Sequence, residues 1–319
     1  RDAWDEHRKL GEDDLFVAGE GPAHSVLNPA LGSVLVDINE ASEAQVDAAV
    51  RAADHAFDGW SQTAPKDRAA LLLKLADLID AHAGELARLE SDNCGKPYPA
   101  ALNDELPAIA DVFRFFAGAS RCLGGSAAGE YLAGHTSMVR RDPLGVVASI
   151  APWNYPLMML AWKIAPALAA GNTVVLKPSE QTPLTALRLG ELAAELFPAG
   201  VLNILFGKGQ SVGMPLVTHP KVRMVSLTGS IATGSQIITG TADSVKRLHM
   251  ELGGKAPVII FDDADIDAAV EGIRTFGFYN AGQDCTAACR IYAQAGIYDT
   301  FVNKLGEAVA SLRHGLQDD

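Results

Sequence analysis

Four short segments of the sequence carry the side chains best suited to catalysis. They are Pro152-Trp153-Asn154-Tyr155-Pro156, Lys177-Pro178-Ser179-Glu180, Met250-Glu251-Leu252-Gly253-Gly254-Lys255 and Gly282-Gln283-Asp284-Cys285. Each segment follows an apolar run or a helical pattern, and open α/β sheets bind their ligands where the strands end. We therefore expect these segments to lie at the ligand-binding edge of a sheet.

Cys285 and Glu251 offer a nucleophile and a base. Cys285 follows a glycine-rich stretch, through which backbone N–H groups can approach whatever the sulfur touches. Taken alone, a cysteine here is more often a small buried hydrophobe. Glu251 is either a helix-capping carboxylate or a general base with a raised pKa. Cys289 makes no metal pair with Cys285, because no His/Cys cluster has the spacing of a zinc site, and we expect no metal.

The remaining segments also allow two interpretations each. Asn154 either caps the helix that follows it or aims its amide at a developing oxyanion. Lys177 and Glu180 are either a surface ion pair or the ligands of a ribose, whose hydroxyls would donate to Glu180. Two glycine loops, Gly207–Gly213 and Thr228–Gly234, suit either plain turns or a pyrophosphate at a helix N-terminus.

The elements before Gly145 are predicted to be mainly helical. After an irregular arm of about 40 residues, a capping-box pattern at Ser42 begins a first helix and Pro65 a second. A third helix is expected over about residues 104–123. Its apolar stripe comprises Val112, Phe113, Phe116 and Ala119. A half-polar hairpin around Gly134 follows, and such a ribbon suits pairing with another subunit.

From Gly145 onward, apolar β-branched runs alternate with helical patterns. The expected strands are Gly145–Ile150, Thr173–Leu176, Val201–Leu205, Val222–Leu227 and Val258–Phe261. The expected helices are Pro156–Ala170, Pro183–Leu196 behind a Thr182 cap, Ser211–Val217, Ile231–Thr239 and one after Asp265. This alternation predicts a doubly wound α/β fold with a parallel sheet.

Composition excludes several classes of protein. The chain has 319 residues, of which 48% are hydrophobic and 20% charged, so it is not disordered. Its net charge of −13 argues against nucleic acid or an anionic membrane as the main partner. The most apolar stretch, residues 156–171, is broken by Lys163 and Pro166 and is too short for a bilayer. Four cysteines in so long a chain indicate a reducing compartment, and we expect the cytoplasm.

Together the four segments resemble the aldehyde dehydrogenase superfamily, and the resemblance covers nearly the whole chain. The G-Q-x-C and E-L-G-G-K motifs of that family imply that Cys285 is the catalytic cysteine and Glu251 the general base, 34 residues apart. The P-W-N-[FY]-P motif implies that Asn154 supplies the oxyanion amide. The resemblance further implies NAD as cofactor, with NADP weaker. The implied cofactor-binding residues are Trp153, Lys177, Ser179, Glu180, Gly207, Gly213, Gly229, Ser230, Gly234, Leu252 and Gly253.

Within the family, the segments 93–97, 113–118 and 279–285 look like those of the aminoaldehyde and betaine-aldehyde branch, especially the bacterial γ-aminobutyraldehyde dehydrogenases. The resemblance implies oxidation of 4-aminobutanal to 4-aminobutanoate through a thiohemiacetal and a thioester. The implied substrate tunnel comprises Tyr155, Met159, Trp162, Tyr279 and Asp284. An aromatic box suits a cationic amine, with Asp284 and Glu105 as anionic partners. In the alternative interpretation, Met159 and Trp162 merely pack a helix face.

The resemblance also implies a division of the chain. Residues 1–128 would form an N-terminal arm and the helical part of the cofactor domain, 129–144 an oligomerisation hairpin, 145–251 the Rossmann-type domain, and 252–319 the start of the catalytic domain. Family members continue well beyond the catalytic cysteine, so we expect the chain to be incomplete at its C-terminus. The hairpin predicts a dimer or tetramer. Two other functions stay open, a broader or betaine-type aldehyde dehydrogenase and a truncated, non-catalytic cofactor-binding or scaffold protein.

Overall fold

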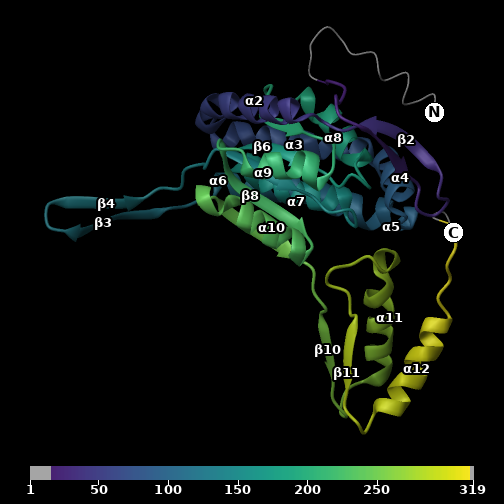
Figure 1. Cartoon of the computed structure of the whole chain (residues 1–319). Coiled ribbons are helices and arrows are strands. Elements are labelled where there is room, and N and C mark those ends of the chain that lie inside the picture. Colours follow the sequence, from purple (N-terminus) through teal and green to yellow (C-terminus); the bar gives the residue numbers. More distant parts are fainter. Residues whose placement is uncertain (1–15, 317–319) are drawn as a thin grey trace.

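The computed structural model describes residues 16–316, so the first 15 residues of the expected arm lie outside it (Figure 1). Its centre is a five-stranded sheet of order β7-β6-β5-β8-β9, in which every neighbouring pair is parallel. The strands are β5 (Val146–Ile150), β6 (Thr173–Lys177), β7 (Leu202–Ile204), β8 (Val222–Gly229) and β9 (Arg247–Leu252). The chain runs from β5 to β6 and β7 on one side and then to β8 and β9 on the other. The predicted doubly wound α/β fold is therefore confirmed.

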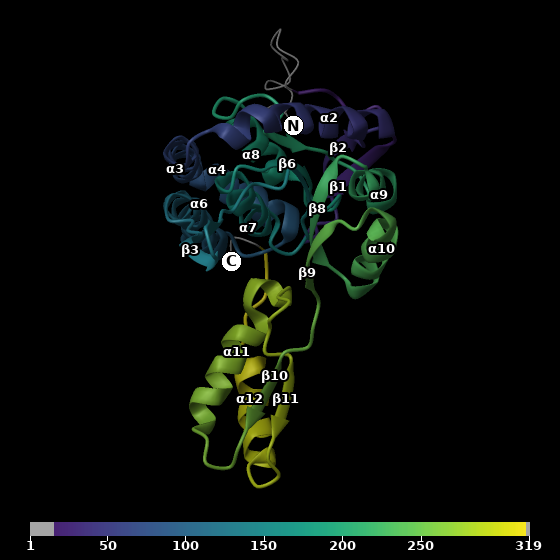
Figure 2. The same ribbon diagram turned by 90° about the vertical axis from the view of Figure 1, so that its left-hand side faces the viewer.

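Helices cover both faces of this sheet (Figure 2). They are α2 (Glu43–Gln62), α3 (Pro65–Ala81), α4 (Ala83–Cys94), α6 (Leu106–Arg121), α7 (Pro156–Ala169), α8 (Leu184–Ala194), α9 (Met214–Thr218) and α10 (Ile231–Thr241). Val174 and Leu176 of β6 belong to a core built with α3, α6, α7 and α8, whereas Val175 belongs to a second core with α2, α9 and α10. All residues of β5 and β6 are buried, as expected for parallel strands covered on both faces.

Two helix starts follow their sequence signals and one does not. The Ser42 hydroxyl accepts the Gln45 N–H while the Gln45 side chain accepts the Ser42 N–H, which confirms the capping box of α2. Helix α3 begins at Pro65, as predicted. The expected Thr182 cap is wrong, because Pro183 is the N-cap residue of α8. The buried Thr182 hydroxyl has no hydrogen-bond partner within the part of the chain that the structure describes.

The apolar face of α6 is rotated slightly from the expected stripe. Phe113 is buried as predicted, but Val112 and Phe116 are only half-buried. Ile109 and Ala117 complete the buried face instead, at a spacing of four residues on either side of Phe113. In a helix of 3.6 residues per turn, this spacing keeps the three side chains on one face.

Two strand regions escape the sequence pattern. Residues 23–39 are not an irregular arm, because β1 (Ala23–Leu27) and β2 (Val34–Asn39) form an antiparallel pair. Strand β9 carries Glu251 and lies at an edge of the main sheet. Its residues alternate between exposed and half-buried, so it contains no continuous apolar run that would mark it as a strand. The helix expected over 211–217 is a π-helical turn, Gly209–Gly213, followed by α9.

Two parts extend from the main body (Figure 1). The expected hairpin is present as β3 (Ser126–Leu132) and β4 (His135–Val139). Beyond β9, a smaller unit has its own core and contains β10 (Pro257–Ile260), α11 (Ile266–Gly282), β11 (Arg290–Ala293) and α12 (Tyr298–Ala310). The domain limits expected from the sequence stay a prediction. Over residues 16–316, no helix is both long and apolar enough to cross a membrane.

The capping box of α2 gives a stability prediction. Ser42→Ala leaves the Gln45 N–H without its side-chain acceptor, and we expect the free energy of unfolding to fall by about 1 kcal/mol. Denaturant unfolding followed by circular dichroism measures this change. Ser61→Ala, near the other end of the same helix, is the control, because the Ser61 hydroxyl only donates to the Asp58 carbonyl at 3.3 Å. Equal stability of the two variants would contradict the importance of the cap.

Candidate active site

The carboxyl edge of the parallel sheet gathers the four segments. Lys177 is the last residue of β6 and is paired in register with Ile150, the last residue of β5. Asn154 follows β5 closely, and Glu251 lies opposite Thr228 near the ends of β9 and β8. Because parallel strands end at the same edge, residues separated by about 100 positions in the sequence come to the same side of the sheet.

Cys285 reaches this edge through the loop that follows α11. The Asn154 Nδ2 group donates to the Gln283 carbonyl at 2.9 Å, so the cysteine loop lies directly against the turn after β5. Asn154 is not a helix cap, because Tyr155 is the N-cap residue of α7 and α7 has no side-chain cap. Its amide therefore faces the Cys285 loop and keeps a second N–H available.

Burial raises the pKa of the Cys285 thiol, and the carboxylates of Asp284 and Glu251 raise it further. The backbone N–H groups of Cys285 and Thr286 act in the opposite direction and lower the pKa of the thiol, and the Thr286 N–H also donates to the Asp284 carboxylate at 2.7 Å. Cys285 is half-buried, so the alternative interpretation of this cysteine as a small buried hydrophobe is wrong. Glu251 lies within strand β9 and cannot cap a helix, so that alternative is wrong as well.

Lys163 is a buried cation that the sequence analysis did not assign to the site. Its Nζ donates to the Ser226 hydroxyl at 3.1 Å, and Ser226 in turn hydrogen-bonds with His249 Nδ1 at 3.1 Å. Burial lowers the pKa of Lys163 to about 8, while the Glu251 carboxylate raises it. The available signal was a lysine inside the most apolar helix of the chain, since buried lysines are rare unless they have a function or a partner.

Lys177 and Glu180 border a cleft of about 290 Å³ between β6 and helices α9 and α10. Lys177 is 3% exposed, so the interpretation as a surface ion pair is wrong. Its Nζ donates to the carbonyls of Pro178 and Gly207, both at 2.8 Å, and lies 3.4 Å from the Glu180 carboxylate. Burial lowers the pKa of Lys177, and Glu180 opposes this shift. A fixed ammonium beside a half-exposed carboxylate fits the hydroxyls of a ribose.

The cleft contains further residues beyond those expected from the sequence. Gly213 lines it as expected, and the unforeseen lining residues are Ile150, Lys208, Gly209, Gln210, Met214, Val217, Thr233, Gln236 and Ile237. Trp153 and Ser179 lie outside this lining. Trp153 is 45% exposed, and the Ser179 hydroxyl accepts the Gln181 N–H. The unforeseen lining residues have no signal in the sequence, because only the fold brings their side chains to one cleft.

The two glycine loops differ in what already occupies them. The buried Glu40 carboxylate accepts hydrogen bonds from the Lys208 N–H and the Ser211 hydroxyl, so an internal anion already sits at the start of the Gly209–Gly213 turn. Helix α10 begins at Ile231 behind the N-cap Ser230, whose hydroxyl accepts the Thr233 N–H and hydrogen-bonds with the Thr233 hydroxyl, so no internal anion from residues 16–316 occupies this start.

Gly234 lies in the first turns of α10 and closes it onto strand β9. A Cβ atom at Gly234 would lie 3.0 Å from the Leu252 side chain, so glycine permits the close contact between α10 and β9. Gly253 continues this contact, because its N–H donates to the Gly229 carbonyl at 3.2 Å. Gly229, Leu252 and Gly253 thus place the start of α10 beside the segment that carries Glu251.

The residues expected in a substrate tunnel divide into two sets. The Tyr155 hydroxyl donates to Asp284 at 3.0 Å and the Tyr279 hydroxyl to Asp104 at 3.3 Å, so tyrosines and acids meet beside Cys285. On α7, by contrast, Met159 is buried as a packing residue would be, whereas Trp162 is 56% exposed and does not pack a helix face.

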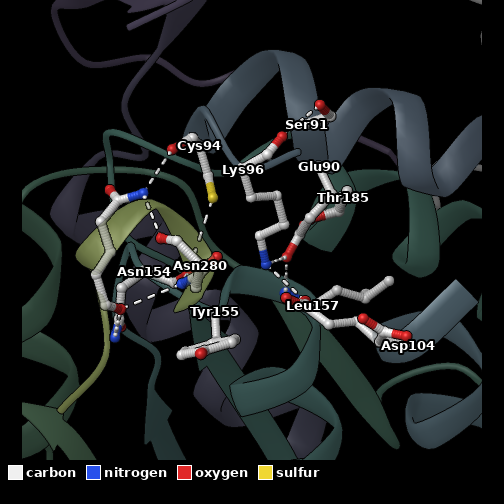
Figure 3. A network of polar contacts seen from close by, with 12 residues as sticks. Glu90, Ser91, Cys94, Lys96, Asp104, Asn154, Tyr155, Leu157, Thr185 and Asn280 are labelled. Carbon is white, nitrogen blue, oxygen red and sulfur yellow. Dashed lines mark hydrogen bonds and ion pairs between the residues drawn. The ribbon is translucent and has the colours of Figure 1, made fainter. Parts of the chain in front are cut away.

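Glu105 does not point freely at this space. Its carboxylate lies 2.5 Å from the ammonium of Lys96, which is fully buried and lies 4.9 Å from the centre of the Tyr155 ring (Figure 3). Burial raises the pKa of Glu105 to about 7, while Lys96 lowers it. Glu90 lies 3.4 Å from the same ammonium. Within the described residues, no group of three or more His, Cys, Asp or Glu could hold a metal.

Comparison with known proteins gives a consistent result. A family model described as aldehyde dehydrogenase family matches residues 16–319. The chain is 43% identical to a betaine aldehyde dehydrogenase of Vibrio vulnificus over 93% of this chain and 61% of that protein. It is 45% identical to a phenylacetaldehyde dehydrogenase of Pseudomonas fluorescens over 89% of this chain and 59% of that protein. The chain thus spans about three fifths of these relatives.

Solved structures agree with these sequence matches. An aldehyde dehydrogenase of Bacillus cereus in its NAD+ complex superposes with a TM-score of 0.92 at 40% identity, covering 95% of this chain and 62% of that one. A betaine aldehyde dehydrogenase of Staphylococcus aureus, also in complex with NAD+, superposes with a TM-score of 0.92 at 38% identity, covering 95% and 61%.

The buried Lys163 gives a pH-dependent prediction. Its pKa in the folded chain, about 8, lies below its unfolded value, so the unfolded state holds more protons above pH 8. The contribution of Lys163 to stability therefore rises with pH. We expect the unfolding free energy of the wild type, relative to Lys163→Met, to increase by about 1–2 kcal/mol between pH 7 and 9.5. Lys74→Met, at an exposed position of α3, is the matched control in the same denaturant titrations. A flat Lys163 difference would contradict a neutralised lysine.

Proposed function

The chain belongs to the aldehyde dehydrogenase family, and on that basis we propose that it oxidises an aldehyde to its carboxylic acid with NAD+ as the hydride acceptor. The observation that carries the proposal is the arrangement at the sheet edge. The Asn154 amide lies against the Cys285 loop, and the Glu251 carboxylate is close enough to raise the pKa of the Cys285 thiol. The cleft of Lys177 and Glu180 opens on the same edge.

In the proposed reaction, the Cys285 thiolate attacks the aldehyde carbon and forms a tetrahedral thiohemiacetal. The second N–H of Asn154 and the backbone N–H of Cys285 donate to the oxyanion, and one such donor contributes about 3–4 kcal/mol to catalysis. NAD+, when bound, accepts the hydride that the tetrahedral carbon releases. The carbon then becomes a thioester of Cys285, and the proton released in this half of the reaction is the one that the Cys285 thiol lost on forming the thiolate.

Glu251 has the second task in this proposal. Its carboxylate takes a proton from water, whose oxygen attacks the thioester carbon and releases the carboxylic acid and the Cys285 thiolate. Lys163 is buried near Glu251, and the Glu251 carboxylate raises the pKa of Lys163. The balance of the whole reaction is aldehyde, NAD+ and water to acid, NADH and a proton.

The cofactor-binding assignments also form part of the proposal. The Glu180 carboxylate accepts hydrogen bonds from the ribose hydroxyls beside Lys177. Its charge disfavours the 2′-phosphate of NADP, so we expect NADP to bind more weakly than NAD. The N-terminus of α10, at Gly229 and Ser230, takes the pyrophosphate, because Glu40 already occupies the other turn. Trp153, which is 45% exposed, is also assigned to the cofactor.

For the substrate we propose an aminoaldehyde, 4-aminobutanal, as in the breakdown of putrescine. Support comes from the two tyrosines, Tyr155 and Tyr279, and the two acids bonded to them, Asp284 and Asp104. Aromatic faces and carboxylates together attract a cationic ammonium. A betaine-type aldehyde is the second candidate, because the same groups would attract a quaternary ammonium. A non-catalytic scaffold has less support, because it gives no role to the Asn154, Cys285 and Glu251 arrangement.

Self-association and location complete the proposal. The hairpin β3–β4 extends from the body, and its exposed large side chains include Tyr131, Leu132, Met138 and Val139. Apolar side chains on an extended two-stranded ribbon suit pairing with another copy, so we propose a dimer or tetramer. We place the protein in the cytoplasm, where free cysteines stay reduced.

Replacing Cys285 tests the reaction itself. Cys285→Ala removes the nucleophile, and we expect NADH formation from 4-aminobutanal, followed at 340 nm, to fall below detection. Cys122→Ala, at an exposed cysteine outside the site, should retain the wild-type rate. Turnover that survives in Cys285→Ala would refute covalent catalysis by this sulfur.

Replacing Asp284 tests the substrate class. Asp284→Asn keeps an acceptor for the Tyr155 hydroxyl but removes the negative charge. We expect kcat/KM for 4-aminobutanal to fall about tenfold. A pair of unit charges at 4 Å contributes ~4 kcal/mol near a protein surface, but solvent screens this site, so the expected loss is smaller. The value for hexanal should stay within about twofold. Asp299→Asn on α12 is the charge-matched control. An equal loss for both aldehydes would refute recognition of the ammonium.

A further inference from the structure

The chain turns sharply just before Cys285, and three consecutive residues take part in the turn. Asn280, Ala281 and Gly282 have left-handed backbone conformations with φ of 52°, 55° and 75°. Glycine and asparagine adopt this conformation readily, whereas an alanine in it costs about 1–2 kcal/mol. The turn therefore requires contacts that hold it against relaxation.

The side chain of Asn280 supplies two such contacts. Asn280 is 4% exposed, and its Nδ2 group donates to the Asn154 carbonyl at 2.8 Å and to the Gln283 carbonyl at 3.1 Å (Figure 3). The Asn154 Nδ2 group donates to the same Gln283 carbonyl at 2.9 Å. Two side-chain amides thus converge on one backbone carbonyl only two residues before Cys285.

Gln283 fastens the turn to a third part of the chain. Its Nε2 group donates to the Asn280 carbonyl at 3.2 Å and to the Cys94 carbonyl at 3.3 Å. Cys94 is the last residue of α4, and its Sγ lies 3.8 Å from the Asn154 carbonyl. The end of α4, the turn after β5 and the Cys285 loop therefore share one polar cluster, which we call the loop cluster and define as Cys94, Asn154, Asn280 and Gln283.

We propose that Asn280 is a positioning residue for Cys285, because its two donated hydrogen bonds fasten the left-handed turn to the Asn154 and Gln283 carbonyls and so fix where the Cys285 sulfur lies. The position of the sulfur matters because opposing groups act on the thiol. Burial and the carboxylates of Asp284 and Glu251 raise its pKa, whereas the backbone N–H groups of Cys285 and Thr286 lower it. We expect a relaxed turn to move the sulfur away from these N–H groups while burial and the carboxylates still oppose the thiolate.

The pH dependence of alkylation at Cys285 tests this proposal. Iodoacetamide is the probe, and peptide mass spectrometry gives the rate at each cysteine separately. Asn280→Gly introduces a residue that readily adopts the left-handed backbone conformation. It adds no charge and removes both donated hydrogen bonds of the Asn280 side chain. We expect its alkylation rate at pH 7 to fall about tenfold and its midpoint to rise by about one pH unit, because only the thiolate reacts. The rate at the exposed Cys122 should not change.

Asn280→Asp is a second variant. It keeps the shape of the side chain and the preference for the left-handed region but replaces the donor with an acceptor. Its midpoint should rise at least as far as that of Asn280→Gly. Because the new carboxylate by itself raises the pKa of a nearby thiol, an unchanged midpoint in Asn280→Asp would overturn the proposal even if Asn280→Gly folds too poorly to measure.

Asn203→Asp is the matched control. The Asn203 Nδ2 group also donates to two backbone carbonyls, those of Val174 at 3.3 Å and Gly200 at 2.7 Å, in β7 at the far edge of the sheet. We expect Asn203→Asp to lower the melting temperature without moving the Cys285 midpoint.

Two outcomes would overturn the proposal. The first is an Asn280→Gly protein whose Cys285 alkylates at the wild-type rate and midpoint. The second is an equal midpoint shift in Asn203→Asp, which would indicate general loosening of the fold. The proposal concerns the nucleophile of the proposed dehydrogenase, but alkylation needs neither cofactor nor aldehyde. A wild-type protein that forms no NADH and still shows the expected shifts would refute the proposed function alone.

Discussion

The parallel hydrogen-bond ladder of the main sheet is the constraint on which the rest of the structure depends. Because β5, β6, β8 and β9 all run in one direction, each strand delivers its following residue to the same edge. Asn154, Lys177 and Glu251 come together for this reason and not through any affinity for one another. Hydrogen bonds between the turn after β5 and the Cys285 loop, among them the one from Asn154 to the Gln283 carbonyl, bring in Cys285 from the smaller unit.

A buried ion cluster lies next to Tyr155 and Leu157, close to the hydrogen bonds that hold the Cys285 loop. Lys96 lies between Glu90 and Glu105, and Glu90 also accepts the Leu157 N–H and the Thr185 hydroxyl. Such a cluster costs desolvation energy, and removing one partner would leave a charge unpaired in the interior. The Glu90 carboxylate therefore holds α4 against the first turns of α7 and α8. The Lys96 ammonium lies over the Tyr155 ring, and this contact helps to fix the position of the ring.

The sequence predicts the sheet and its helices well where one face or both are continuously apolar, as in β5 and β6. It fails at β9, which carries Glu251, because this edge strand alternates polar and apolar residues and lacks the continuous apolar run from which the other strands were predicted. The motifs identify the reacting side chains, but they assign no role to Lys163 or to Asn280, although Asn280 lies within the segment 279–285. Their importance arises from burial and from contacts across more than 60 residues, which spacing along the chain does not encode.

Glu40 shows how a fold can complete a loop without its ligand. This carboxylate comes from the residue after β2 and reaches the turn at Gly209–Gly213, where it receives an N–H and a hydroxyl. The wall of the cleft is consequently organised within the chain by an internal carboxylate. If the cleft holds a dinucleotide, as proposed, this turn is already formed before the dinucleotide associates, so ordering it costs little conformational entropy.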